Sequence, residues 1–468
     1  MQSEKQLISR RYWLFLSLGL VLFMATLDQT ITTTALNGIV QELGHLNQSV
    51  WVITSFLLTS AVMTLIFGKL GDIFGRKRIL QLALGLFMVG SLLSGLSPSM
   101  LTLILARGFQ GIGAGGLNSL VQAVLADLVP ARQRGKYQAL FGLISMVALI
   151  AGPVLGGYFV QYLTWRWIFF INLPIGIVAM AILGFKLTLP QSQQPKTMAI
   201  DYFGGGLATG ITTLTLLMVT LGGTTVAWMS PTMLGMLLGD LALIVVYLVV
   251  EQRAKASALT PLTLFRNGTF NIASLMFALS TAALFVAMIY VPMVAQQVYR
   301  VTTSRAGFDI IPTLVALIIG TMIAGMVIER TGKYKALPII GALLMLGGFY
   351  GLSQLANSWS LMIWQIPVGL GIGIFTQISL LVGQNTVAVQ DLGTATGVLN
   401  FFKTLGGAFG SAIFGVILTA QLTRPALSHL QAFQTVFGWG LPLAGLLLVL
   451  SLFLKAEPLS DEVLAYEE

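Results

Sequence analysis

The sequence predicts an all-α polytopic membrane protein with fourteen transmembrane helices. Of its 468 residues, 56% are apolar and only 9% are charged, whereas an average soluble domain carries roughly 25% charged residues. Apolar runs close to the roughly 20 residues that a helix needs to span a bilayer recur from Tyr12 to Leu454. The placement of Lys and Arg along the chain favours an even number of spans.

Each predicted span is an apolar run bounded by charged residues, glycine or proline. The longest connections, near 190–202 and 251–268, flank the seventh and eighth spans. The fourteen predicted spans are 12–36, 50–70, 79–97, 101–126, 136–160, 167–189, 203–223, 231–250, 269–295, 307–328, 337–355, 359–386, 393–419 and 434–454.

Basic residues indicate the orientation, because cytoplasmic loops carry an excess of Lys and Arg. With the N-terminus inside, most bases fall in inner segments, among them the run Arg76-Lys77-Arg78. The bases left in outer loops are Arg166, Arg300, Arg305 and Arg424. We therefore expect a multi-pass protein of the cell membrane with both termini in the cytoplasm. The first span is too long for a cleaved signal and lacks a typical cleavage site.

Missing residue types and motifs exclude several functions. The chain has no cysteine, which excludes disulfides and thiol sites. Its two histidines, His45 and His429, fall between apolar runs, which argues against a zinc or catalytic histidine site. There is no Gly-x4-Gly-Lys-Ser/Thr phosphate loop. We expect no metal, no cofactor, no nucleic-acid partner and no enzymatic activity.

A weak internal repeat relates the first six spans to the last six, as in transporters built from two parallel halves. Its matching residues are Gly68 with Gly325, Asp72 with Glu329, Gly75 with Gly332, Arg76 with Lys333, Arg107 with Gln365, Gly111 with Gly369, Gly113 with Gly371, Gly152 with Gly406 and Gly156 with Gly410. We predict six-helix bundles at 1–190 and 257–468. A linker at 191–256 would carry the two extra transmembrane helices.

Four ionisable residues fall inside predicted spans: Asp28, Arg107, Asp240 and Lys403. A charge at mid-membrane costs at least about 2.5–3.5 kcal/mol on insertion scales, so each is a candidate for function. Asp28 lies where span one becomes rich in hydroxyl groups, including that of Thr33, and such a face should line water. Asp28 would hold a proton in one state and release it when a cationic substrate arrives. Alternatively, it is a structural carboxylate bonded to neighbouring helices.

The other three residues each have two interpretations. Arg107, which cannot lose its charge, either tunes a nearby carboxylate or bonds to loop carbonyls. Lys403 follows Asn400 in span thirteen, and we expect it to extend to the inner interface rather than contact a substrate or an anion. Asp240 in span eight is either structural or a second coupling residue. Its possible hydrogen-bond partners in span seven are Thr209, Thr213 and Thr220.

Two motifs predict gating. The inner loop after span two carries Gly68, Asp72, Gly75 and Arg76. The excess of basic residues in cytoplasmic loops explains Arg76. It does not explain the acid Asp72, which recurs as Glu329 in the second half. We expect the acids to bind bases or a helix N-terminus and latch the two halves in one state. In span five, Gly152 and Gly156 form a ridge of small residues, and Pro153 follows Gly152. This pattern suits a helix at a moving interface. Tight packing is the alternative.

Together these motifs resemble the major facilitator superfamily, specifically its fourteen-spanner drug:proton antiporter branch. The resemblance covers nearly the whole chain and is carried by Leu27 to Thr30, Gly68 to Arg78, Arg107 to Gly115, Gly152 to Gly157, Trp165 to Gly176 and Tyr290 to Pro312. It implies the major facilitator fold and alternating access between two bundles. Asp28 and Arg107 match the family's proton-coupling positions, and Asp72 and Arg76 match its gating loop. Thr33 and Asn37 depart from the span-one motif.

The resemblance implies a proton-coupled antiporter that exports amphipathic and cationic drugs, as in antibiotic resistance. Its partners would be protons, lipophilic or cationic small molecules and the lipid bilayer, and we expect a monomer. The residues assigned to coupling or substrate binding are Asp28, Arg107, Asp240, Lys403, Asn400 and Thr33. The alternative is an exporter of one lipid, fatty acid or metabolite on the same fold. A membrane enzyme or receptor without transport is a remote third possibility.

Overall fold

The computed structural model describes residues 2–44, 48–130, 133–186, 201–222, 226–254, 258, 260–301, 308–388, 391–422, 428–456 and 459. In this part of the chain the elements are α-helices and one short 3-10 helix. Helices of the first half are α1 (Gln2–Leu43), α2 (Ser49–Phe74), α3 (Arg76–Gly95), α4 (Met100–Leu128), α5 (Arg134–Tyr162), α6 (Trp167–Phe170) and α7 (Asn172–Lys186). A hairpin follows, formed by α8 (Tyr202–Leu221) and α9 (Pro231–Ala254).

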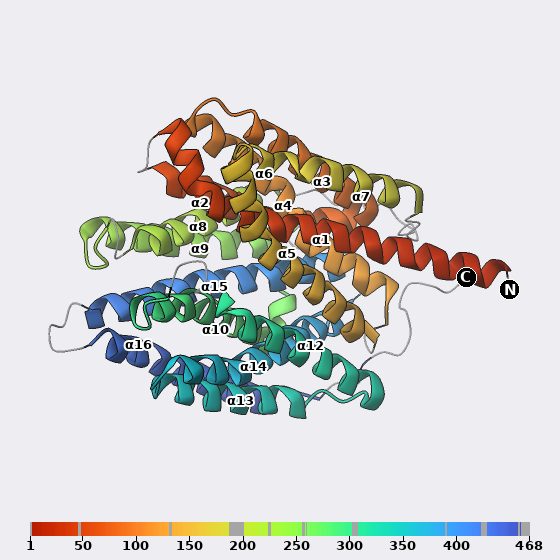
Figure 1. The fold of residues 1–468 in the computed structure, drawn as a ribbon. Helices are drawn as coiled ribbons and strands as arrows, with labels where there is room; N and C mark the ends of the chain where they lie inside the picture. The colour runs from red at the N-terminus through yellow and green to blue at the C-terminus, as the bar shows by residue number, and fades with distance from the viewer. Residues whose placement is uncertain are drawn as a thin grey trace.

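The second half begins with the 3-10 helix η4 (Leu264–Arg266). Its α-helices are α10 (Gly268–Gln297), α12 (Ile311–Thr331), α13 (Ala336–Ser353), α14 (Ser358–Asn385), α15 (Leu392–Leu422), α16 (His429–Gly438) and α17 (Gly440–Phe453). Figure 1 shows the red-to-yellow helices of the first half lying above the green-to-blue helices of the second half. We call the side where α1 begins and α17 ends the terminal side, and the other the far side.

The helices confirm the predicted all-α membrane architecture. Thirteen helical segments among the described residues are long and apolar enough to cross a membrane, and the apolar part of α8, residues 203–219, is shorter. Helix α1 begins at Gln2, ten residues before the predicted span. Two predicted spans are each broken into two helices, at Ile171 and Trp439. Pro174 and Pro442 follow these breaks at the third helical position, where a missing N–H removes no helical hydrogen bond.

Glycines of α4 and α14 let neighbouring helices approach to backbone contact, and they do so equivalently in both halves. A Cβ at Gly113 would lie 2.4 Å from the Phe87 nitrogen of α3, and one at Gly371 would lie 2.5 Å from the Gly341 oxygen of α13. On the side of α4 that faces α2, Thr64 Oγ1 donates to the Gly115 carbonyl at 3.1 Å. Thr321 Oγ1 repeats this bond to the Gly373 carbonyl at 3.2 Å. The predicted internal repeat therefore describes a real packing equivalence.

The glycine ridge of α5 packs inside its own half. A Cβ at Gly152 would lie 2.0 Å from Thr30 Oγ1, and one at Gly156 would lie 3.1 Å from the Ile31 oxygen, both on α1. Gly406 and Gly410 pack equivalently against Ala278 and Ala282 of α10. The ridge itself therefore serves tight packing, the alternative interpretation, while α5 also packs against α12 of the other half. Pro153 is exposed beside the ridge.

The α8–α9 hairpin lies over the junction of the two halves. Helix α8 packs against both α2 and α15, and Figure 1 places the hairpin between the two sets of helices. Leu65 of α2, Ala208 of α8 and Leu399 of α15 share one apolar cluster. The hairpin thus belongs to neither bundle alone. The predicted bundle limits at 190/191 and 256/257 lie outside the described residues and stay predictions.

The two halves meet closely near the terminal side. A Cβ at Gly135, the second residue of α5, would lie 2.3 Å from the Cα of Gly325 in α12. A Cβ at Gly68 of α2 would lie 2.6 Å from the Gly393 oxygen of α15. Slightly deeper, Asn400 Nδ2 of α15 donates to Gln122 Oε1 of α4 at 2.9 Å. These contacts form a seam, and the seam is closed in this structure.

A larger residue at Gly135 should hold the terminal side open, because the added carbons would occupy the space of the Gly325 backbone. The chain has no cysteine, so Gln122→Cys with Asn400→Cys gives a clean pair for a short thiol crosslinker. We expect Gly135→Leu to reduce the crosslinking yield several-fold. Gly157→Leu in the same helix is the matched control, since a Cβ there meets nothing within 4 Å. Equal yields in both variants would contradict the assignment of Gly135 to the seam.

Candidate functional site

The centre of the first half contains a buried ion pair between α1 and α4. Arg107 Nη1 lies 2.6 Å from Asp28 Oδ2. The Asp28 side chain is 0% exposed and that of Arg107 is 1% exposed. A charge buried in this way requires a partner and further hydrogen bonds to offset its lost hydration. The pair therefore ties α1 to α4 at the core of this bundle.

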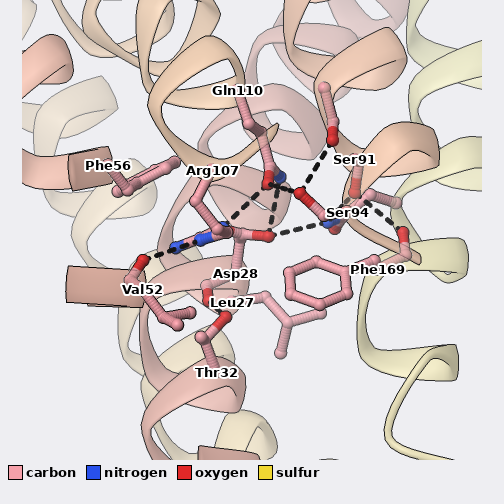
Figure 2. A network of polar contacts seen from close by, with 12 residues as sticks. Leu27, Asp28, Thr32, Val52, Phe56, Ser91, Ser94, Arg107, Gln110 and Phe169 are labelled. Atoms are coloured by element: carbon pink, nitrogen blue, oxygen red, sulfur yellow. Dashed lines mark hydrogen bonds and ion pairs between the residues drawn. The ribbon is translucent and has the colours of Figure 1, made fainter. Parts of the chain in front are cut away.

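Two amide side chains complete the coordination of the Asp28 carboxylate. Gln110 Nε2 and Asn172 Nδ2 each donate to Asp28 Oδ1 at 2.9 Å. Asn172 Nδ2 also donates to Ser91 Oγ at 2.9 Å, and the Ser91 hydroxyl donates to the Phe169 carbonyl at 2.9 Å. The network thus joins α1, α3, α4, α6 and α7. Figure 2 shows Gln110, Ser91 and Ser94 grouped on one side of the pair.

The guanidinium group of Arg107 has contacts besides Asp28. Nη1 also donates to Gln110 Oε1 at 2.8 Å, and Nε donates to the Val52 carbonyl of α2 at 3.2 Å. The Phe56 ring centroid lies 4.1 Å from the Arg107 Cζ atom, a cation–π distance. Val52 and Phe56 lie on the opposite side of Arg107 from Gln110 (Figure 2). Arg107 therefore has protein partners that would remain if Asp28 became neutral.

Donors from three residues surround the Asp28 carboxyl group. Its two oxygens accept three hydrogen bonds, from Arg107, Gln110 and Asn172. A carboxylate offers about four acceptor positions, so these bonds use most of its capacity. The carboxyl group is thus held by side chains of α4 and α7.

The structure corrects one expectation about Asp28. Its side chain does not line water, because it is fully buried inside the first half. The exposed part of this stretch of α1 consists of Gln29, Thr33 and Thr34. Thr33 Oγ1 donates to the Thr30 carbonyl of its own helix at 2.7 Å and does not reach Asp28. The helical period separates the two faces, with Asp28 facing the bundle and Thr33 facing away from it.

Sequence reasoning identified both charges but not their amide partners. Gln110 lies three residues after Arg107 and therefore on the same helix face, a signal that could have been used. Asn172 lies far along the chain, and nothing in its local sequence links it to Asp28. Ser91 and Ser94 also escaped notice, because a serine in an apolar span is usually bonded to its own helix.

The predicted gating acid Asp72 contacts the other half directly. Asp72 Oδ1 accepts from the Gly393 nitrogen at 2.9 Å, and Oδ2 accepts from the Thr394 nitrogen at 2.6 Å and its hydroxyl at 2.8 Å. Gly393 and Thr394 are in the first turn of α15, where backbone N–H groups lack helical partners and attract negative charge. Asp72 therefore binds a helix N-terminus across the seam, as a latch would require.

Arg76, four residues after Asp72, holds the Asp72 side chain in place. Arg76 Nη2 lies 2.9 Å from Asp72 Oδ1, and Arg76 also pairs with Asp127 of α4. Gly75 adopts φ 90°, a value that favours glycine, at the sharp turn between α2 and α3. Arg134 anchors the start of α5 by donating to the Val129 and Ala126 carbonyls at 2.9 and 2.7 Å. Asp127 and Arg134 were not singled out from the sequence.

The second gating acid, Glu329, has a different environment. It is exposed near the end of α12. Glu329 lines a cavity of about 450 Å³ together with Lys136 of α5 and Arg330, Met322 and Met326 of α12. It thus faces the start of α5 as Asp72 faces the start of α15. The predicted symmetry of the two acids holds for position but not for burial.

Two remaining candidates lie on α15. Asn400 is buried and bridges the halves through Gln122, as described above. Lys403 does not extend to the terminal-side interface as expected. Its Nζ lies 5.5 Å from the centroid of Phe277 in α10, and Phe277 is nine residues, or about 13 Å, from the terminal-side end of that helix.

The candidate Asp240 lies within the hairpin. Thr215 Oγ1 of α8 donates to Asp240 Oδ2 at 2.8 Å, and Asp240 is 5% exposed. Thr215 was not among the threonines predicted as partners; Thr209, for example, bonds to the Gly205 carbonyl of its own helix. Asp240 therefore links α8 to α9 and lies apart from the Asp28 network.

A fourth ion pair lies at the far-side end of the first half. Arg166 Nη1 lies 2.5 Å from Glu42 Oε1, and Trp165 Nε1 donates to Glu42 Oε2 at 2.7 Å. Hydrogen bonding by Arg166 holds the pKa of Glu42 below its usual value. Arg166 also donates to the Ser97 carbonyl at 3.2 Å. This contact fixes the far end of α1 relative to the α3–α4 and α5–α6 turns.

The described residues contain no group of three or more histidine, aspartate or glutamate side chains that could hold a metal ion. What the site offers is a buried carboxylate–arginine pair inside the first half and an acid, Asp72, that binds a helix N-terminus of the other half.

Comparison with known proteins places the chain among membrane transporters. The family model "Major Facilitator Superfamily" matches residues 18–411. An uncharacterized MFS-type transporter of Mycobacterium tuberculosis is 35% identical over 89% of this chain, and the match covers 60% of that relative. The multidrug transporter protein MdtP of Bacillus subtilis is 35% identical over 88% of this chain and 76% of its own length.

A solved structure shows the same fold. The crystal structure of the human organic anion transporter MFSD10 (TETRAN) superposes with a TM-score of 0.66 at 16% identity, covering 93% of this chain and 99% of that one. The likeness at this identity concerns the fold. The expected two-bundle architecture is thereby confirmed.

Breaking the buried ion pair from one side should destabilise the protein more than removing both charges. Arg107→Gln leaves an unpaired buried carboxylate, which costs about 3–5 kcal/mol. The double variant Asp28→Asn with Arg107→Gln leaves no charge and copies the second half, where Gln365 occupies the position of Arg107. We expect the double variant to unfold at a higher temperature than Arg107→Gln alone. Thermal unfolding of purified protein would test this, and equal melting temperatures would count against the pairing.

Removing the charge of Asp72 should weaken the latch. Asp72→Asn loses the ion pair with Arg76 and presents an amide to a helix N-terminus, where a cap contributes about 0.5–2 kcal/mol. We expect crosslinking of the Gln122→Cys/Asn400→Cys pair to decrease. Thr394→Val, which removes one of the three latch bonds, should have a smaller effect. A latch role would be refuted if Asp72→Asn left the yield unchanged.

Proposed function

The chain belongs to the major facilitator superfamily, and from this premise we propose that it exports amphipathic small molecules across a cell membrane in exchange for protons. The relatives support export, since the efflux pump dotC of Dothistroma septosporum is named for it and MdtP is named a multidrug transporter. We propose that the terminal side, which carries most of the bases, is cytoplasmic. The energy source would then be the proton gradient, and no cofactor is required.

The observation that carries the proposal is the buried Asp28–Arg107 pair. Asp28 accepts hydrogen bonds from Arg107, Gln110 and Asn172 while the terminal-side seam is closed. A proton arriving at Asp28 would neutralise it and remove its attraction for Arg107. Arg107 would keep its bonds to the Val52 carbonyl and Gln110 and its contact with Phe56. The proton would thus loosen α1 from α4 without leaving the arginine unpartnered.

A packed route leads from Asp28 to the seam. Thr30, two residues after Asp28, contacts Gly152 of α5. The same α5 carries Gly135, which meets Gly325 at the seam. We propose that a shift of α1 on protonation is passed along α5 and changes the closure of the seam. The Asp72 latch on α15 would release in the same transition, so that the site faces the two sides alternately.

The expected cation selectivity does not follow from Asp28 in this state. A cationic substrate would have to displace Arg107 and two amides from a side chain that is 0% exposed. We therefore assign Asp28 to proton coupling, and export of cationic drugs stays a prediction from sequence. The alternative, export of one physiological lipid, fatty acid or metabolite, gains support from Lys403, a base that could bind the anionic group of such a molecule.

Everted membrane vesicles provide the test of antiport. Addition of a transported compound to vesicles with an acidic lumen should release protons from the lumen, and Asp28→Asn should abolish this release. The matched control is Asp240→Asn in the hairpin, which should retain it. Both variants must first match the wild type in membrane amount and in substrate binding without a gradient. Proton release by Asp28→Asn would overturn the assignment of Asp28, and loss confined to Asp240→Asn would transfer the role to Asp240.

A further inference from the structure

Lys403 lies on the face of α15 that is turned toward the protein interior. On the same face, Thr396 contacts Gln384 of α14, and Asn400 contacts Gln122 of α4. Seven residues after Lys403, Gly410 packs on α10. This helical spacing places Lys403 in one row with these contacts. The exposed apolar residues of the helix, Phe409, Ile413 and Val416, lie on the opposite face.

The ammonium group of Lys403 has an apolar environment. Its contact is the ring of Phe277, whose centroid lies 5.5 Å from Nζ, and the Lys403 side chain is half-buried. Within the part of the chain that the structure describes, Lys403 takes part in no ion pair with a carboxylate. A cation–π contact offsets only a fraction of the lost hydration of an ammonium ion.

Carboxylates elsewhere in the spans do not provide the missing counter-charge. Asp28 binds Arg107, and Asp72 and Asp127 bind Arg76. Asp240 accepts a hydrogen bond from Thr215 within the hairpin. None of these carboxylates supplies a counter-charge to Lys403, so an anionic ligand can supply it. A half-buried ammonium group within apolar spans suits a ligand with one charged and one apolar part.

We propose that Lys403 binds the anionic group of the transported molecule, so that the substrates are amphipathic organic anions. A carboxylate, sulfonate or phosphate group would lie against the ammonium group, and the apolar part of the molecule would extend from it among the apolar side chains of the spans, since Phe277 itself is buried. This inference rests on the proposed export function and specifies its substrate class. It assigns different tasks to the two halves. The Asp28–Arg107 network of the first half would respond to protons, and Lys403 of the second half would bind the substrate.

Binding of matched probes to purified protein in nanodiscs of zwitterionic lipid tests the proposal. Naphthalene-2-sulfonate and the uncharged naphthalene-2-sulfonamide differ mainly in charge, and equilibrium dialysis measures their affinities without any gradient. We expect the wild type to prefer the sulfonate about tenfold, as a charge-assisted contact implies. Lys403→Met should abolish this preference and Lys403→Arg should retain it. Lys455→Met, which removes an exposed base after the end of α17, is the control and should bind as the wild type does.

Two outcomes would overturn the proposal: a wild type that does not prefer the sulfonate, or a Lys403→Met variant that still does. If Lys403→Met fails to fold, Lys403→Gln replaces it, and the arginine variant shows whether charge alone restores binding. Addition of an anionic phospholipid to the nanodiscs distinguishes a lipid headgroup from a soluble anion, because only a lipid ligand would displace the sulfonate. Failure of proton exchange in vesicles would overturn antiport but would not alter this binding result.

Discussion

The interior of the first half is organised around the ion pair of Asp28 and Arg107. A bilayer offers no water to hydrate a charge, so two opposite charges in the apolar core must satisfy each other and their remaining hydrogen-bonding groups. Here the remaining bonds come from Gln110, Asn172 and a backbone carbonyl. Six helices contribute to the network, α1, α2, α3, α4, α6 and α7, so a single carboxyl group lies at the point where all of them are linked.

The two halves share a packing scheme but differ in chemistry. Glycines at equivalent positions bring the helices to backbone contact in both, and the pair Thr64–Gly115 reappears as Thr321–Gly373. At the position of Arg107 the second half has Gln365, which bonds to Thr313 and the Asp309 carbonyl. A neutral amide there needs no buried carboxylate. The duplicated scaffold thus holds the buried ion pair in one half, while the other half carries Lys403 next to an aromatic ring.

The closed seam is built from contacts that can be made and broken without exposing a large apolar surface. Glycine backbones meet at Gly68–Gly393 and Gly135–Gly325, and a carboxylate meets a helix N-terminus at Asp72. Gln377, next to Gly135, is buried without a hydrogen-bond partner for either polar atom. The seam contacts lie between backbones and polar groups, so the seam depends little on apolar burial.

The sequence alone determined the architecture, the repeat and the charges that matter, because the hydrophobic run length and the cost of an intramembrane charge are local properties of the chain. It located Asp28, Arg107 and Asp72 for that reason. Only the tertiary structure decided which face of each helix turned inward, and hence that Asp28 is fully buried, that Lys403 lies over Phe277, and that Gly152 packs on α1. It also supplied Asn172 and Asp127, whose roles depend on helices brought together from distant parts of the chain. Rotation about a helix axis is set by packing against neighbours, and neither composition nor spacing specifies it.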